Sequence, residues 1–181
     1  MAVLNIFGFT STKMENNELV KVREAFHRPV SKANIEEILS MPATGASTET
    51  IKAYQAVSRT MMAEFVTSPF SKLSYFKKGK NQLESIILEN KSLETIYLRL
   101  LIQLNIPSLL GYYSKIESDL DYFCSNFESS EIDEQTKQLF KETLMKTEKM
   151  SVLERASAPT PKFFKTIRNW GLVLGALGGT L

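Results

Sequence analysis

The chain of 181 residues is poor in the residue types from which most catalytic and metal sites are built. It contains one histidine, His27, and one cysteine, Cys124. A single cysteine cannot form an internal disulfide, so nothing in the sequence requires an oxidising compartment. One histidine and one cysteine cannot form a typical zinc site without several carboxylates, and no glycine-rich phosphate loop is present. We therefore expect a protein without cofactor or metal, and one that is not an enzyme.

A large excess of charge and a secretory signal are also missing. The formal net charge is only +2, whereas a nucleic-acid binder normally carries a strong basic excess. The first thirteen residues, MAVLNIFGFTSTK, have no charge before Lys13 and a broken apolar run, which does not match a secretory signal. We expect a cytoplasmic protein that does not bind nucleic acid. Residues 1–15 are expected to be an unstructured N-terminal lead, with Met14 as an alternative start.

What the sequence does contain is a set of helical patterns around one apolar segment, Ser92–Tyr113. Its apolar residues recur at the spacing of one wide helix face, and two more lie on the opposite side. They are Leu93, Ile96, Tyr97, Leu100, Leu101 and Leu104, with Leu98 and Ile102 opposite. The pattern predicts a helix buried on nearly every side. It should end at Ile106-Pro107, because proline disfavours helical geometry in the residue before it.

Similar spacing predicts further helices, and no stretch shows the alternation of a β-strand. The expected helices cover about 18–27, 31–41, 48–66, 69–87, 114–127 and 129–154. Their expected starts are Ser31, Ser68-Pro69, the capping box Ser114-x-x-Glu117, and Ser129-Ser130. The prediction is an all-α domain over 16–155, with six to seven helices in antiparallel hairpins, as a tetratricopeptide-like array or an irregular bundle. A linker over 156–161 and an apolar C-terminal helix or tail over 162–181 should follow.

Gly79 lies in the middle of the helix expected after Pro69, where glycine costs ~1 kcal/mol relative to alanine. Close approach of a neighbouring helix would compensate for this cost. The same helix is expected to bury Leu73 and Phe76, and the helix before it to turn Phe65 toward the core.

A polar row at four-residue spacing, Thr95, Arg99 and Gln103, runs along one edge of the central helix. Burying an unpaired guanidinium is expensive, so Arg99 needs a partner. We expect a structural ion pair with Asp119 or Asp121 on the following helix. The functional alternative is that Arg99 and Gln103 line a groove that binds a carboxylate or a peptide backbone.

The segment 162–181 is the most suggestive stretch for contact with a partner. Basic and aromatic residues precede an apolar run, as at a membrane interface, and glycines every four residues would let two helices approach closely. The residues are Lys162, Phe163, Phe164, Lys165, Arg168, Trp170, Gly171, Gly175 and Gly179. The run from Trp170 to Leu181 is shorter than the ~20 residues that span a bilayer. Contact with a membrane surface, self-association or protein docking, and internal packing all fit this pattern.

Charge is unevenly distributed along the chain. Lysines gather around Tyr75 and Phe76, namely Lys72, Lys77, Lys78 and Lys80. Residues 115–134 contain seven acids against one lysine. Such stretches are usually solvated helix faces. The alternative is that they are complementary surfaces for partners or self-assembly, where charge mainly speeds and orients association.

The remaining chemical candidates are His27 and Cys124. His27 precedes Arg28-Pro29 at a predicted helix end, where interaction with terminal carbonyls is its expected role. Cys124 lies on an apolar helix face, as a small core residue would. The enzymatic alternative, a hydrolase or transferase that uses either residue, would require the two side chains to meet in space.

Two runs within residues 53–123 carry a resemblance. They are F-x-x-x-P-x-x-K-L-x-Y-F-x-x-G-K from Phe65 and Y-L-R-L-L-I-Q-x-N-x-P-x-x-L-G-Y from Tyr97. This region resembles a group of small, uncharacterised helical proteins of Bacteroidetes-type bacteria, which implies a tetratricopeptide-like fold and no known activity. Separately, MSVLERASAPTPKFFKTIRNWGLVLGALGGTL, residues 150–181, resembles the start of small phage-type or holin-like membrane proteins. The two resemblances suggest a fusion.

These features together predict a non-enzymatic helical interaction or scaffold protein, which binds another protein through a groove near Arg99 and Gln103. The alternative is a membrane-associated or phage-derived structural component that assembles through residues 162–181. A membrane-surface partner is therefore expected only through this C-terminal segment.

Overall fold

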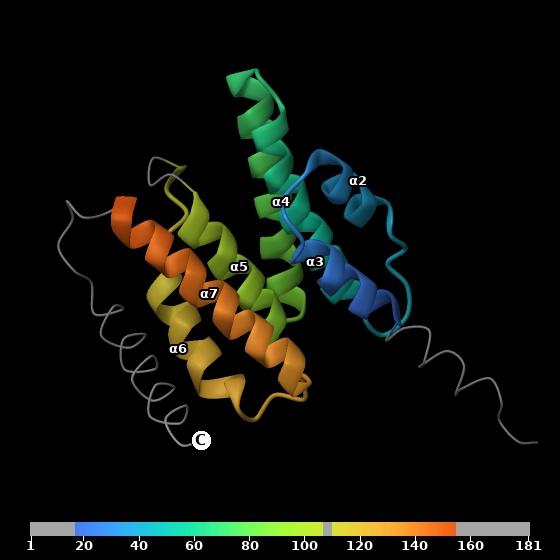
Figure 1. Cartoon of the computed structure of the whole chain (residues 1–181), viewed down its shortest axis with the longest axis vertical. Coiled ribbons are helices and arrows are strands. Elements are labelled where there is room, and N and C mark those ends of the chain that lie inside the picture. The colour runs from blue at the N-terminus through green and yellow to red at the C-terminus, as the bar shows by residue number, and fades with distance from the viewer. Residues whose placement is uncertain (1–16, 107–109, 155–181) are drawn as a thin grey trace, which may run out of the picture. The chain divides into compact units, whose positions relative to one another are not determined.

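The computed structural model describes residues 17–106 and 110–154, apart from the side chains of 148–154, and this part of the chain is helical without a β-strand (Figure 1). A first helix covers residues 17–26. It is followed by α2 (Lys32–Ser40), α3 (Thr48–Met61), the 3-10 helix η1 (Met62–Phe65), α4 (Pro69–Glu89), α5 (Leu93–Asn105), α6 (Ile116–Phe127) and α7 (Glu134–Glu154). The all-α prediction is confirmed, and the tetratricopeptide-like array stays a prediction. The expected lead, linker and C-terminal helix lie outside the described residues.

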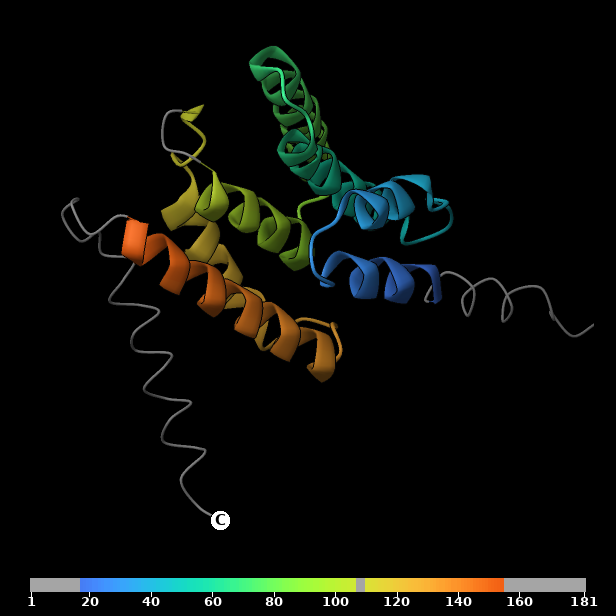
Figure 2. The ribbon, with the colours of Figure 1, turned by 45° about the horizontal axis from the view of Figure 1, so that its top comes forward.

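The helices group into two compact units, Met1–Ile102 and Gln103–Leu181, that divide inside α5. In the first unit, α3 and α4 pack against each other as an antiparallel hairpin, with η1 in the connection. The end of the hairpin that carries η1 extends beyond the helix 17–26 and α2 in both views (Figures 1 and 2). The hairpin therefore has an inner part within the unit and a projecting end.

Gly79 marks a close approach of the two helices of the hairpin. A Cβ atom at this position would collide with the carbonyl oxygen of Ala56, and would lie 2.9 Å from the backbone nitrogen of Thr60. Backbone atoms cannot move aside as the end of a flexible side chain can. The predicted close approach at Gly79 is confirmed, and it explains why a poor helix former occupies the middle of α4.

The central helix is buried as its pattern predicts. Every residue from Leu93 to Leu104 is buried, including the four polar residues Glu94, Thr95, Arg99 and Gln103. The helix ends at Asn105, just before Ile106-Pro107. Its polar side chains must therefore find partners inside the protein.

The predicted starts of the earlier helices are correct. Ser31 is the N-cap of α2, and its Oγ accepts a hydrogen bond from the Asn34 N–H at 3.1 Å. Pro69 occupies the first turn of α4 after Ser68, where the missing N–H of proline costs nothing. These two starts fix where the chain enters the helices of the first unit.

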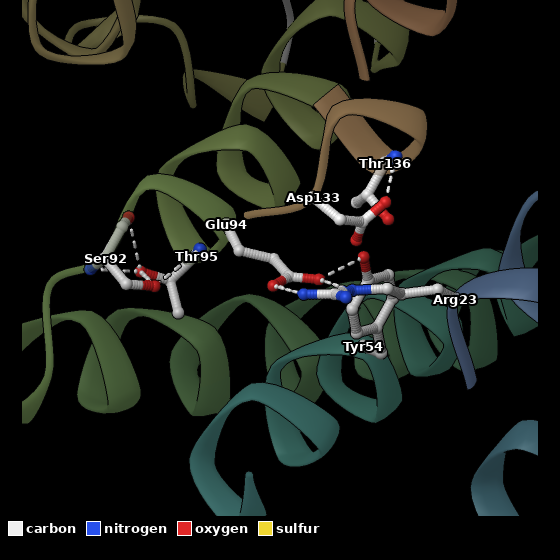
Figure 3. A network of polar contacts seen from close by, with 7 residues as sticks. All are labelled: Arg23, Tyr54, Ser92, Glu94, Thr95, Asp133 and Thr136. Atoms are coloured by element: carbon white, nitrogen blue, oxygen red, sulfur yellow. Dashed lines mark hydrogen bonds and ion pairs between the residues drawn. The ribbon is translucent and has the colours of Figure 1, made fainter. Parts of the chain in front are cut away.

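The predicted starts of the two later helices are wrong. Lys115 is the N-cap of α6 and makes no side-chain cap bond, so the Ser114 capping box does not form. Acids in the first turn of α6 favour the helix start by charge instead. Before α7, the carboxylate of Asp133 accepts from the Thr136 N–H at 2.9 Å (Figure 3). This charged acceptor replaces the expected cap at Ser129-Ser130.

The second unit contains α6 and α7, which meet through aromatic and cationic side chains. Phe123 and Phe127 of α6 have ring centroids 5.1 Å apart. The Nζ of Lys141 from α7 lies 5.4 Å from the Phe127 ring centroid, within cation–π range. Phe140 of α7 is fully buried. No helix in the described part of the chain is both long and apolar enough to cross a bilayer.

Candidate functional site

The predicted polar row on α5 is buried, and its first member has a local role. The Oγ1 of Thr95 accepts from the Ser92 N–H at 2.9 Å, and the Thr95 N–H donates to the Oγ of Ser92 at 3.1 Å (Figure 3). This reciprocal pair satisfies two donors at the start of the helix. Thr95 therefore serves as part of a capping box.

Arg99 and Gln103 have different surroundings. The Nη1 of Arg99 lies 3.2 Å from Oε2 of Glu84 on α4, and both side chains are largely buried. Gln103 is buried as well, and its Oε1 is one of the buried side-chain atoms without a hydrogen-bond partner in the described residues. The ion pair of Arg99 with Glu84 was not predicted. Pairing with Asp119 or Asp121, and binding of a partner by the row, stay predictions.

The densest polar cluster of the first unit centres on Glu94, which sequence reasoning missed. Its carboxylate accepts two bonds from Arg23, from Nε to Oε1 at 2.7 Å and from Nη2 to Oε2 at 2.6 Å. The O–H of Tyr54 on α3 donates to the same Oε1 at 2.7 Å. Figure 3 shows the guanidinium and the phenol converging on the carboxylate. One acid thus joins the first helix, α3 and α5.

Histidine 27 extends this cluster toward α5. Its Nδ1 lies 2.7 Å from the carbonyl oxygen of Arg23, so it is the protonated nitrogen that donates. Its Nε2 lies 2.8 Å from the O–H of Tyr97 and accepts from it. The ring also stacks on Tyr97, with centroids 6.0 Å apart. The expected contact of His27 with a terminal carbonyl is confirmed.

The protonation states in this cluster favour structure over chemistry. Burial lowers the pKa of His27, so its ring is neutral at pH 7. Burial, followed by the charge of Glu94, raises the pKa of Tyr54 well above its usual value. The tyrosine stays protonated as a donor, and the Glu94 carboxylate already accepts three bonds. Such a network holds helices together more readily than it accommodates a substrate.

The thiol of Cys124, the other chemical candidate, has a raised pKa. Burial, followed by the charge of Asp121, raises the pKa of the Cys124 thiol, which is half-buried on α6. Reactive cysteines instead have a lowered pKa. Cys124 and His27 belong to different units, so their meeting stays untested. Within the described residues, no group of three or more histidine, cysteine or acidic side chains could hold a metal ion.

Two exposed surfaces remain as candidate interaction sites. The first is the projecting end of the hairpin, residues 64–78, which we call the hairpin tip. It exposes Phe65, Phe70 and Leu73 together with Lys72, Lys77 and Lys78. The expectation that Phe65 and Leu73 are core residues is wrong, because this end of the hairpin projects past the helices that bury its inner part (Figure 2).

The second surface is acidic and belongs to the second unit. Glu117, Asp121 and Glu128 are exposed and follow one another at spacings of four and seven residues, so they share one face of α6 and its C-terminal end. Glu131 is exposed in the loop that follows, and Tyr113 is exposed just before the helix. We call these five residues the acidic face. Tyrosine is enriched in protein interfaces, and charged residues lie at their rim.

The predicted contact residues of segment 162–181, from Lys162 to Gly179, lie outside the described residues. Comparison of the chain with protein-family models, curated proteins and solved structures finds no match in any of the three. The resemblances of residues 53–123 and 150–181 stay predictions.

Proposed function

We propose that this chain is a non-enzymatic helical interaction or scaffold protein, which binds another protein. The observation that supports it most is that the polar side chains around Glu94 form hydrogen bonds with one another. The side chains that could take part in a reaction, Arg23, His27 and Tyr54, form hydrogen bonds with residues of α5. Exposed side chains of one charge lie on separate surfaces. These exposed charged surfaces are the parts of the molecule suited to bind a partner.

The acidic face is the proposed contact for the protein partner. Complementary charge would steer a basic protein surface toward α6 and orient it. Tyr113 would supply an aromatic anchor, which is a residue type that dominates binding energy in many interfaces. Charged residues at the rim contribute more to association rate than to affinity.

Affinity capture from the native cell with the full-length chain tests this proposal. A variant with Asp121→Asn, Glu128→Gln and Glu131→Gln should lose the captured partner, and the loss should also appear in wild type at high salt. A matched variant removes three exposed acids of the first unit, Glu24→Gln, Glu36→Gln and Glu89→Gln, and should retain it. Equal capture by both variants would overturn the role of the acidic face, and no partner in any form would overturn the function.

The second candidate function is association with a membrane surface. It was first suggested by the basic and aromatic composition of residues 162–181. The hairpin tip independently combines exposed apolar side chains with lysines, which is the composition of interfacial binding elements. Co-sedimentation of the full-length protein with lipid vesicles tests this function directly. Protein that remains in the supernatant at every lipid concentration would overturn it.

A further inference from the structure

An apolar stripe on α4 leaves the interior of the protein at the hairpin tip. Phe76, Leu73 and Phe70 follow one another at three-residue spacing toward the helix N-terminus, so each neighbours the next on the helix surface and the row winds slowly around the helix. Their exposed fractions rise from 6% at Phe76 to 38% at Leu73 and 86% at Phe70. A phenylalanine this exposed gains nothing from the fold, because its apolar surface stays in water.

The charge around this stripe has one dominant sign. Lys77 lies one turn from Leu73 toward the C-terminus on the same side of α4, and Lys72 and Lys78 are also exposed. The hairpin tip contains these three lysines and a single acid, Glu64 in η1. The hairpin tip, which projects in both views (Figures 1 and 2), therefore combines exposed lysines with exposed apolar side chains.

This combination matches an anionic bilayer better than a protein partner. In protein–protein interfaces lysine, like aspartate and glutamate, belongs to the polar rim and is depleted from the core. On interfacial membrane elements, lysine is instead enriched beside phenylalanine and leucine. Lysine side chains are also long enough to keep the ammonium group in water while their stems lie against lipid. A projecting end can reach a flat surface without any change in the helices that support it.

We infer that the hairpin tip binds the surface of an anionic lipid bilayer. Phe70 and Leu73 enter the boundary between headgroups and acyl chains, and Lys72, Lys77 and Lys78 contact the negative headgroups. This inference rests on the second proposed function and names the residues and the lipid charge that it requires. The close contact at Gly79 holds the tip in place at its inner end.

The test is co-sedimentation of the full-length protein with two kinds of vesicle, phosphatidylcholine alone and phosphatidylcholine mixed with phosphatidylserine. Binding should require phosphatidylserine and fall with salt. Replacing the three lysines by glutamine should weaken binding by about fivefold per lysine. Phe70→Ser with Leu73→Ser should weaken it at least ~10-fold. Unchanged binding in either variant would overturn the inference.

A control residue exists on the same helix. Leu88 is 84% exposed at the other end of α4, outside the lysine cluster. Leu88→Ser removes a leucine that is more exposed than Leu73, and it should leave vesicle binding unchanged. A loss equal to that of the tip variant would mean that general surface hydrophobicity, and not the tip, drives binding.

A variant of segment 162–181 distinguishes this inference from the membrane function on which it rests. In the full-length chain, Phe164→Ser with Trp170→Ser alters the basic and aromatic segment and leaves the tip intact. If only this tail variant loses binding, membrane association stands and the tip inference fails. If wild type binds neither vesicle, both fail. If the lysine variant loses binding to duplex DNA but not to vesicles, the tip is a nucleic-acid contact and the inference also fails.

Discussion

The inner part of the α3–α4 hairpin is tightly packed, whereas its tip exposes apolar and charged side chains to water. In the inner part, Tyr54 donates to a buried carboxylate, and Gly79 leaves no room for a single additional carbon. At the tip, Phe70 and the neighbouring Lys72 face water. The same two helices thus contain residues that packing determines and residues that packing does not explain. Substitutions of buried residues of the hairpin should act on stability, and substitutions of exposed residues at the tip should act on binding.

The largest expected effect comes from breaking the cluster at Glu94. Glu94→Leu leaves the guanidinium of Arg23 and the O–H of Tyr54 buried without their acceptor, and should cost about 3–5 kcal/mol in the free energy of unfolding. Urea denaturation measures this loss. The double variant Arg23→Met, Glu94→Leu should recover part of it, because the guanidinium that loses the Glu94 carboxylate is then removed as well. Equal losses in the single and double variants would contradict the ion-pair explanation.

The next largest effect should come from Gly79→Ala. The added Cβ must push α3 and α4 apart, which should cost about 1–3 kcal/mol, against a gain of ~1 kcal/mol in helix propensity. Thermal or urea unfolding should therefore show a net loss. Asn81→Ala, at an exposed position on the same helix, is the matched control and should be neutral or slightly stabilising. A stabilised Gly79→Ala variant would rule out the close contact.

A smaller effect with a clear pH dependence is expected at His27. Because burial lowers its pKa in the folded protein, the unfolded chain binds a proton at a higher pH than the folded one. The stability that depends on a neutral His27 is complete above pH ~6.5 and is lost as the pH falls toward the folded pKa. His27→Gln should cost about 1 kcal/mol near pH 8.

The measurement for His27 is the difference in unfolding free energy between wild type and His27→Gln across pH. This difference should narrow as the pH falls below 6.5. Tyr97→Phe removes the hydrogen-bond donor to Nε2 and keeps the ring, so it should retain the pH dependence while losing stability at neutral pH. A difference that stays constant with pH would contradict a lowered pKa.

The smallest change in stability is expected at the tip. Phe70→Ser should alter the free energy of unfolding by less than ~0.5 kcal/mol, because it is a surface substitution. Phe76→Ala, six residues further along the same stripe but buried, should cost about 3–5 kcal/mol. Comparable losses in both variants would show that Phe70 is part of the core and would remove the contrast between the two ends of the hairpin.

The sequence allowed the central helix and the contact at Gly79 to be predicted, because each depends on local rules. A helix that is apolar on all sides must be buried, and a glycine in mid-helix needs a reason. The partner of Arg99 could not be predicted, since it depends on which helix lies alongside. Helical spacing placed Leu73 on the correct side of α4 but cannot tell how far a neighbouring helix extends to cover it.

The need of Glu94 for a partner could be predicted in the same way as that of Arg99. A carboxylate on a helix buried on every side needs a cation just as a guanidinium needs an acid. Its partner, however, lies 71 residues earlier in the chain, and Arg23 sits in an ordinary amphipathic pattern. Sequence could have indicated that Glu94 has a partner, but only the packing of the first helix against α5 identifies it.

The contact at Gly79 also determines which residues of α4 face which residues of α3. If α4 slid along its neighbour by one turn, Phe76 or Leu83 would have to occupy the place of Gly79 beside the Ala56 carbonyl, where not even a Cβ atom fits. A single glycine therefore acts as a notch that admits one alignment of the two helices. Any ligand that engages the outer end of the hairpin meets a surface whose spacing this notch has already set.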